Sequence, residues 1–110
     1  MHIREFQRMM RQVYFHQDSS RGPRGTYNWL VDEVQELGEA LEGNNIGALE
    51  DEFADVIAWV ASLANILEVD LEKAALSKYR GKCPKCGETS CQCAPIECPP
   101  SSSFRPNNFR

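Results

Sequence analysis

The strongest constraint on this chain is an acidic block over residues 29–55, which holds nine of the 16 acidic residues and no basic residue. No Lys or Arg occurs anywhere between Arg24 and Lys73. A run of like charges this long repels itself unless a counter-charge offsets it. We therefore expect the block to bind a cation.

Apolar residues within and around this block recur with the period of an amphipathic helix. Four segments show this period, and they are residues 3–14, 28–43, 48–67 and 71–79. The third segment is expected to be the longest and the most buried. Because no segment alternates with period two, we expect an all-α fold, a four-helix bundle over residues 1–80.

The segments between these helices carry turn and capping residues. Ser, Gly and Pro fill residues 16–25, which predicts a loop there. Thr26 or Asn28 is expected to cap the second helix, and Asp70 the fourth. The short turn at residues 43–47 makes the second and third helices antiparallel.

Helical phase selects four acids from the block. At about 100° per residue, Glu33 and Glu36 lie on one flank of the second apolar stripe. Glu52 and Asp55 lie on the same rotational flank of the third stripe. In antiparallel helices these flanks meet on one side, so we expect four carboxylates to face a common cleft.

Hard oxygen ligands without His or Cys suit Mg²⁺ or Mn²⁺ and leave coordination positions for water and phosphate oxygens. The pattern therefore indicates phosphate-ester chemistry. The alternative is that both acidic pairs are ordinary solvated helix faces. The other acids of the block lie further round each helix and are expected to be solvated.

The motifs WLVDEVQELGEAL and LEDEFADVIAWVASLA resemble those of the MazG-type nucleoside triphosphate pyrophosphohydrolases. The resemblance covers about residues 3–80, although Gln35 stands where the family commonly has Gly. It implies Mg²⁺-dependent cleavage of a (d)NTP between the α and β phosphates, giving a (d)NMP and pyrophosphate. It also implies that Glu33, Glu36, Glu52 and Asp55 are the metal ligands, and that the chain forms a homodimer or homotetramer.

A negative cleft needs cationic side chains to hold a negative substrate. We expect Arg21 and Lys78 to contact the phosphates, with Arg24 and Arg80 behind them. The resemblance implies a phosphate-contacting Lys near position 78 and a charged D-x-x-R-G loop, which here begins at Asp18.

The two tryptophans have two interpretations. Trp29 and Trp59 either stack on a nucleobase or belong to the core. We include Trp29 among the expected substrate-binding residues, together with Arg21, Lys78 and Asp18.

All five cysteines lie within residues 81–98, which we expect to form a zinc-knuckle-like extension. The Cys83-Pro-Lys-Cys86-Gly segment is one zinc half-site, and Cys91 and Cys93 can complete it. Four thiolates leave no open position, so the zinc is structural. Cys98 is either a substitute ligand or a free thiol, and residues 99–110 are expected to be a disordered tail.

Charge and hydropathy argue against a general nucleic-acid-binding protein and a membrane protein. The net charge of −4 argues against a general nucleic-acid binder. No apolar run approaches a membrane span and no signal peptide is evident, so we expect a cytoplasmic protein. The alternative to the enzyme is a non-catalytic module, in which the knuckle and the helices bind nucleic acid or protein. The nucleobase is left open.

Overall fold

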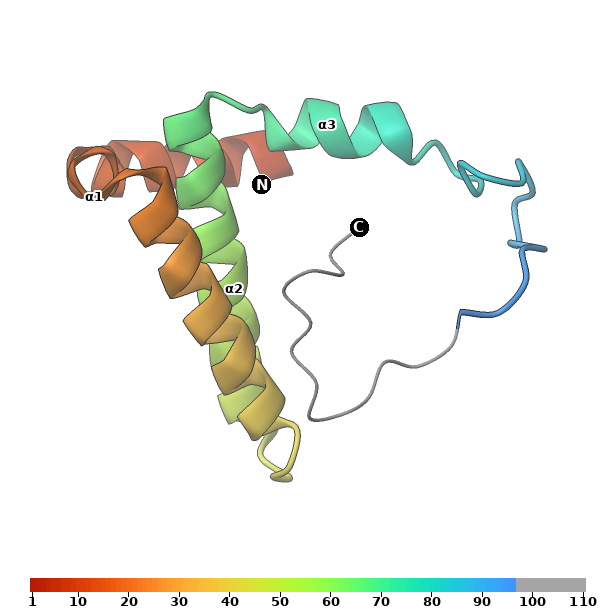
Figure 1. Ribbon diagram of the computed structural model, residues 1–110, viewed down its shortest axis with the longest axis horizontal. Helices are drawn as coiled ribbons and strands as arrows, with labels where there is room; N and C mark the ends of the chain where they lie inside the picture. Colours follow the sequence, from red (N-terminus) through yellow and green to blue (C-terminus); the bar gives the residue numbers. More distant parts are fainter. Residues whose placement is uncertain (97–110) are drawn as a thin grey trace. The chain divides into compact units, whose positions relative to one another are not determined.

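The computed structural model describes residues 1–96, and this part of the chain contains three helices and no strand. They are α1 (Ile3–Ala40), α2 (Ile46–Leu67) and α3 (Leu71–Lys78) (Figure 1). The all-α prediction is therefore confirmed. The chain divides after Lys78 into two compact units, and the first unit holds all three helices.

Three helices are found instead of four because the first two expected helices are joined in α1. The loop expected over residues 16–25 is wrong: only Gly22, at φ 85° and ψ 171°, leaves the helical conformation. Glycine tolerates this positive φ, and Pro23 begins the next helical turn, where its missing N–H leaves no helical bond unmade. The Ser, Gly and Pro residues of this segment therefore interrupt the helix at Gly22 alone.

A hydrogen-bond network spans this break. The Arg21 Nη1 atom donates to Asp18 Oδ1 at 2.9 Å and to Thr26 Oγ1 at 3.1 Å. Asp18 and Thr26 are the largest fully buried side chains of the described residues. Thr26 is thus an interior helical residue and not the expected helix cap.

The second half of α1 and the whole of α2 form an antiparallel hairpin, as the short turn predicts (Figure 1). The last helical residue of α1 is Ala40, three residues before the expected end, and Leu41 is its C-cap. Asn45 caps α2, since its side chain accepts from the Ala48 N–H at 3.1 Å. The hairpin brings the two acidic motifs side by side.

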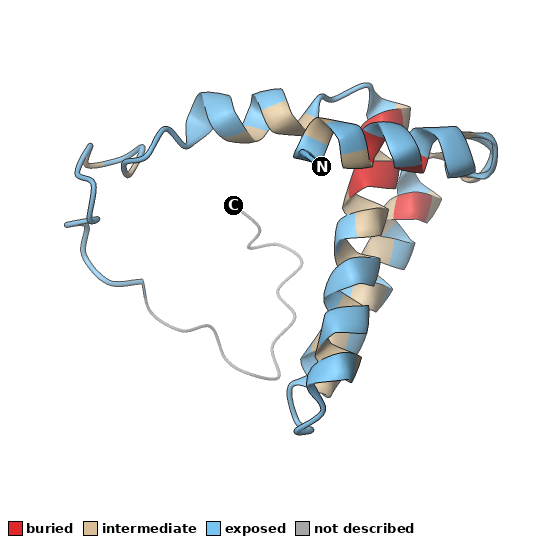
Figure 2. Ribbon diagram, turned by 180° about the vertical axis from the view of Figure 1, so that it is seen from behind, coloured by how far each residue is buried: buried red, intermediate tan, exposed pale blue. Residues whose placement is uncertain are grey.

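The core lies where the first half of α1 crosses the end of α2 (Figure 2). A buried polar pair locks this crossing: Gln7 Nε2 donates to Asn65 Oδ1 at 3.1 Å, and Asn65 Nδ2 donates to the Gln7 carbonyl at 3.1 Å. Gln7 Oε1 also accepts from the Leu71 N–H at 3.0 Å. One side chain thereby joins α1, α2 and the start of α3.

The cap expected for the short helix is confirmed, because Asp70 Oδ1 accepts from the Lys73 N–H at 3.1 Å. This bond lowers the pKa of Asp70. Arg4 pairs with Asp70 and with Glu72, both at 3.0 Å, and so ties α3 to the start of α1.

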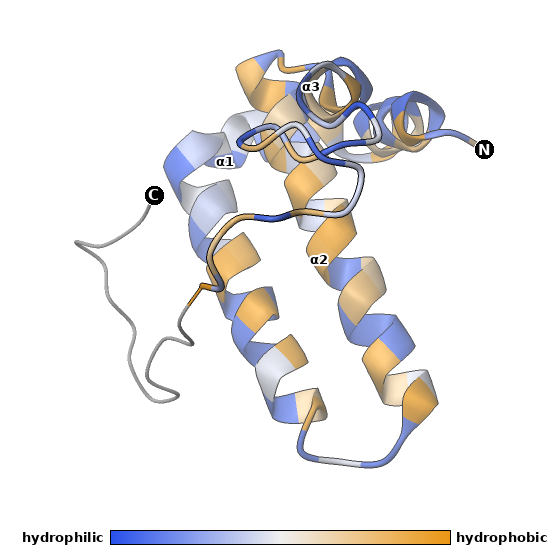
Figure 3. Cartoon of the chain, turned by 90° about the vertical axis from the view of Figure 1, so that its right-hand side faces the viewer, coloured by the Kyte–Doolittle hydropathy of each residue, from blue (hydrophilic) through white to orange (hydrophobic). Residues whose placement is uncertain are grey.

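The expectation that α2 is the longest helix is wrong, but the expectation that it is the most buried is confirmed, because a larger share of residues is buried or half-buried in α2 than in α1 or α3. α1 is longer, and Phe53 and Ile57 on α2 are 59% and 51% exposed. Val34 on the facing half of α1 is 50% exposed, and Leu41, the C-cap, is 65% exposed. Figure 3 shows that hydrophobic residues recur along both helices of the hairpin. Neither these helices nor α3 is long and apolar enough to cross a membrane.

The expected domain boundaries at residues 80 and 98 stay predictions. Cys98 and the expected tail over residues 99–110 lie outside the described residues.

Candidate functional site

The hairpin gathers three of the four expected carboxylates. One oxygen each from Glu33 and Glu36 on α1 and from Glu52 on α2 lie within 4.8 Å of one another. Glu33 and Glu52 are half-buried, and Glu36 is exposed. We call these three residues the acidic group.

The surroundings of Glu36 and Glu52 raise the proton affinity of both carboxylates. A hydrogen bond with the Asp32 side chain, together with the charge of Glu33, raises the pKa of Glu36 to about 7. Burial, followed by the charge of Asp55, raises the pKa of Glu52. The Oε1 atom of Glu52 is buried and has no hydrogen-bond partner. The group therefore lacks positive charge, which a divalent cation supplies.

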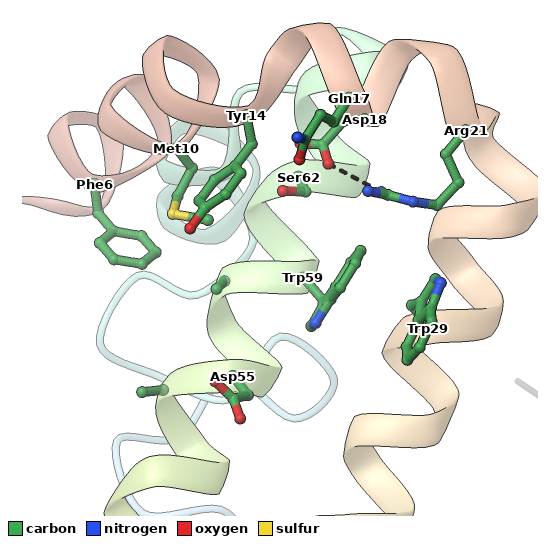
Figure 4. Close-up of a pocket in the computed structure, with 12 residues that line it drawn as sticks. Phe6, Met10, Tyr14, Gln17, Asp18, Arg21, Trp29, Asp55, Trp59 and Ser62 are labelled. Carbon is green, nitrogen blue, oxygen red and sulfur yellow. Dashed lines mark hydrogen bonds and ion pairs between the residues drawn. The ribbon is translucent and has the colours of Figure 1, made fainter.

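Asp55, the fourth expected carboxylate, lies outside the acidic group. It is exposed and lines an adjoining pocket (Figure 4). Asp55 follows Glu52 by three residues, about one helical turn, so it lies next to the acidic group along α2.

The adjoining pocket has a volume of about 630 Å³ and lies between α1 and α2. This is within the usual range for small-molecule sites. Aromatic side chains line one part and polar side chains another, and the principal members are Tyr14, Gln17, Asp18, Arg21, Trp29, Trp59 and Ser62. Figure 4 shows Gln17, Asp18 and Ser62 at one end, Asp55 at the other and Trp59 between them. We call this space the aromatic pocket.

Trp29 and Trp59 stack across the hairpin, with ring centroids 5.7 Å apart and an interplanar angle of 11°. The Arg21 guanidinium lies 4.8 Å from the centroid of the Trp59 ring. Such a cation–π contact fixes a positive charge beside the aromatic wall.

A hydrogen bond connects the aromatic pocket to the acidic group. The Trp59 Nε1 atom donates to Glu33 Oε2 at 3.1 Å. Sequence reasoning missed this role of Trp59, although a signal existed. Trp59 follows Glu52 and Asp55 by seven and four residues, which is the spacing of one helix face. Gln17 and Ser62 were also missed, and no comparable signal distinguishes them.

The expected basic residues are distributed differently. Arg21 lines the aromatic pocket, whereas Arg24 lies 5.3 Å from the Tyr27 ring centroid. Lys78 is the last residue of α3 and is not among the residues that line the pocket. Arg80 belongs to the second unit.

The second unit gathers four cysteines. The Sγ atoms of Cys83, Cys86, Cys91 and Cys93 lie within 4.8 Å of one another. Backbone N–H groups aim at these sulfurs: the N–H of Lys85 lies 3.4 Å from Cys83 Sγ, and that of Gln92 lies 3.4 Å from Cys86 Sγ. We call these four residues the cysteine group.

The backbone closes the first half of the cysteine group into a tight turn. The Gly87 N–H donates to the Cys83 carbonyl at 2.8 Å, and Gly87 takes the positive φ of 78° that glycine tolerates. The N–H of Gln92 lowers the pKa of Cys86 to about 6. Hydrogen bonds from the backbone therefore favour the thiolate of Cys86, which is the metal-binding form, whereas hydrogen bonds with the Cys91 side chain and the other sulfurs raise the pKa of Cys93 to about 12.

A protein-family model matches a part of the chain that includes the acidic group and half of the cysteine group. The model of the MazG nucleotide pyrophosphohydrolase domain matches residues 21–87, which is more than half of the chain. The matched range contains the acidic group, Trp59 and the first half of the cysteine group. No curated protein matches the chain significantly. The family match and the all-helical fold agree, and the chain belongs to the MazG nucleotide pyrophosphohydrolase family.

Proposed function

We propose that this protein is a Mg²⁺-dependent pyrophosphohydrolase that cleaves a (d)NTP between the α and β phosphates, releasing a (d)NMP and pyrophosphate. The observation that carries the proposal is the acidic group beside the aromatic pocket in a chain of this family. The two sites match the two halves of a nucleotide, because a metal site suits its phosphates and an aromatic site suits its base.

The residues of the acidic group fit Mg²⁺ or Mn²⁺. Their donors are carboxylate oxygens, and the buried Glu52 Oε1 has no other partner. Glu33, Glu36 and Glu52 would hold the ion, with Asp55 one turn further along α2. When bound, Mg²⁺ supplies neutralisation of phosphate charge and activation of water.

The side chains of the aromatic pocket bind and orient the nucleoside. Trp29 and Trp59 offer ring surface for the base, and Arg21 provides a cation beside them. Trp59 also holds Glu33 by its indole N–H, so binding of the base and orientation of a metal ligand share one residue. Lys78 remains our proposal for a further phosphate contact.

We also propose that the cysteine group holds one structural Zn²⁺. Four sulfur donors within 4.8 Å of one another are the donor set that tetrahedral zinc prefers. With all four positions filled by thiolates, this zinc stabilises its segment and takes no part in hydrolysis.

The active form is proposed to be a homodimer or homotetramer. The described residues bury only three apolar side chains, Met10, Ala61 and Ala64, while the hairpin exposes several large ones. A second copy would cover this apolar surface.

A pyrophosphate-release assay with a panel of ribo- and deoxynucleoside triphosphates and Mg²⁺ tests the function. Wild type is expected to turn over, and Glu36→Gln and Asp55→Asn are expected to lose about 100-fold or more in kcat/KM. Glu42→Gln, an exposed change in the turn after α1, is the matched control. Unchanged activity in both site variants would refute the site. No turnover of any nucleotide would instead favour a non-catalytic binding module.

A further inference from the structure

One acceptor in the aromatic pocket has no donor. Asp18 is 2% exposed and lines the polar end of the pocket. Its Oδ1 atom accepts from Arg21 Nη1 at 2.9 Å (Figure 4). Its Oδ2 atom is buried and has no hydrogen-bond partner. A buried carboxylate oxygen without a donor is unfavourable, so its presence in a binding pocket points to a donor on the ligand.

The other oxygen of the same carboxylate is held by its surroundings. Arg21 holds Oδ1, donates to Thr26 with the same nitrogen, and lies over the Trp59 ring. These contacts span the break at Gly22 and hold Oδ1, so Oδ2 is the oxygen of this carboxylate that is left for a ligand. Asp18 is therefore an acceptor that is already in place before a ligand binds, and it can recognise a hydrogen-bond donor on one edge of the ligand.

The position of Asp18 matches the base end of a nucleotide. Along α2 the pocket runs from Asp55 past Trp59 to Ser62, which spans seven residues or ~10 Å of helix. This is the scale of a nucleoside whose phosphates lie at the acidic group. Asp18 lies at the far end, beside Ser62 and Gln17 (Figure 4).

We propose that Asp18 Oδ2 accepts a hydrogen bond from the exocyclic amino group of the nucleobase, so that the enzyme prefers cytosine and adenine nucleotides to their keto counterparts. This inference rests on the proposed function. An amino group supplies the missing donor. A keto oxygen at the same place would face the carboxylate, and two buried acceptors repel each other. Sites built to bond one polar group reject analogues that lack it.

Two matched substrate pairs test the preference. CTP and UTP differ at one edge of the pyrimidine, and ATP and ITP differ at the corresponding edge of the purine. Wild type is expected to favour the amino member of at least one pair by about tenfold or more in kcat/KM. Wild-type ratios within about twofold for both pairs would overturn the proposal.

Asp18→Asn supplies the decisive variant. The asparagine Oδ1 can still accept from Arg21, while its Nδ2 places a donor where Oδ2 stood. The preference is expected to shift toward UTP or ITP by about tenfold or more relative to wild type. Because this is a ratio of two substrates on one sample, partial misfolding does not change it. Glu42→Gln should keep the wild-type ratio, and an unchanged ratio in Asp18→Asn would contradict the proposal.

Binding of the products separates this inference from the proposed hydrolysis. Both tryptophans of the chain line the aromatic pocket, so quenching of their fluorescence reports ligand binding there. CMP is expected to bind more tightly than UMP, or AMP more tightly than IMP. Such a preference without any turnover would support the role of Asp18 and refute the hydrolase. Turnover without a base preference would support the hydrolase and refute the proposed role of Asp18.

Discussion

At the scale of single residues, Trp59 takes part in both halves of the site. Its N–H bonds Glu33, and its ring stacks on Trp29. Trp59→Phe keeps an aromatic ring but removes this donor, so Glu33 loses an orienting contact. We expect the Mg²⁺ concentration for half-maximal activity to rise by about tenfold or more. Metal titrations of the pyrophosphate-release assay measure this change.

Trp29→Phe is the control for this positioning role. It changes the aromatic wall without removing a bond to the acidic group, so the KM for nucleotide should rise while the Mg²⁺ dependence stays near that of wild type. Equal Mg²⁺ dependence of the two variants would show that the indole N–H of Trp59 does not orient Glu33.

The elevated pKa of Glu36 predicts how metal binding depends on pH. In the folded protein the pKa of Glu36 is about 7, above the ordinary glutamate pKa of 4.5. Between these values the folded state binds more protons than the unfolded state, so the free energy of unfolding falls as pH rises. Mg²⁺ removes this penalty by replacing the proton. Its increase in Tm should therefore be larger at about pH 8 than at about pH 6.

Glu36→Gln tests the assignment of this effect, because glutamine does not titrate. The variant should lose most of the pH dependence of the Mg²⁺-induced Tm shift. A wild-type shift that is equal at both pH values would contradict the prediction.

At the scale of secondary-structure elements, the break in α1 rests on Gly22. Its φ of 85° is strained for any residue with a Cβ atom, so Gly22→Ala should lower the free energy of unfolding by about 1–2 kcal/mol. Gly38 lies inside the same helix, and an added Cβ atom there meets nothing within 4 Å. Gly38→Ala should raise stability by up to about 1 kcal/mol. Urea unfolding at one fixed protein concentration measures the free energy of unfolding of both variants. A change of the same sign in Gly22→Ala and Gly38→Ala would contradict the prediction.

The cysteine group is the second element with a direct test. Elemental analysis should find one zinc per wild-type chain, and Cys86→Ser should lose it, because three thiolates and a hydroxyl make a poorer site. Cys98→Ser is the control, and it should keep the metal. Loss of zinc in Cys98→Ser would mean that Cys98 replaces one of the four proposed ligands.

Features that depend on local sequence patterns could be predicted, whereas most features that depend on tertiary contacts could not. Helical period located all three helices of residues 1–96 except for the middle of α1, because period depends on neighbours in the sequence. The predicted loop over residues 16–25 was wrong because Ser and Pro residues do not show how many residues leave the helical conformation. Here only Gly22 does. Helical phase predicted that Glu33, Glu36 and Glu52 lie together, but it does not predict the positions of side-chain atoms, and Asp55 lines the pocket instead. The spacing of Trp59 from Glu52 and Asp55 places it on the acidic face of α2, but this spacing does not identify Glu33 on the other helix as its partner.

At the scale of the whole molecule, the exposed apolar residues of the hairpin predict self-association. Phe53 and Ile57 are four residues apart on one face of α2, and more than half of each is exposed. Burial against a second copy would stabilise the assembly by about 25 cal/mol for each Å² of apolar surface removed from water. A large contiguous apolar patch is otherwise rare on the surface of a monomer. We therefore expect wild type to elute as a dimer or tetramer at micromolar concentration.

Light scattering coupled to size-exclusion chromatography tests this expectation against the chain mass of 12.5 kDa. The double variant Phe53→Glu/Ile57→Glu places two charges in the proposed contact, and its mass should fall toward that of one chain, because burial of unpaired carboxylates opposes association. Leu76→Glu, on an exposed position of α3, adds the same kind of charge outside the hairpin and should leave the mass unchanged. A monomeric wild type would mean that the apolar face of the hairpin is covered by something other than a second copy.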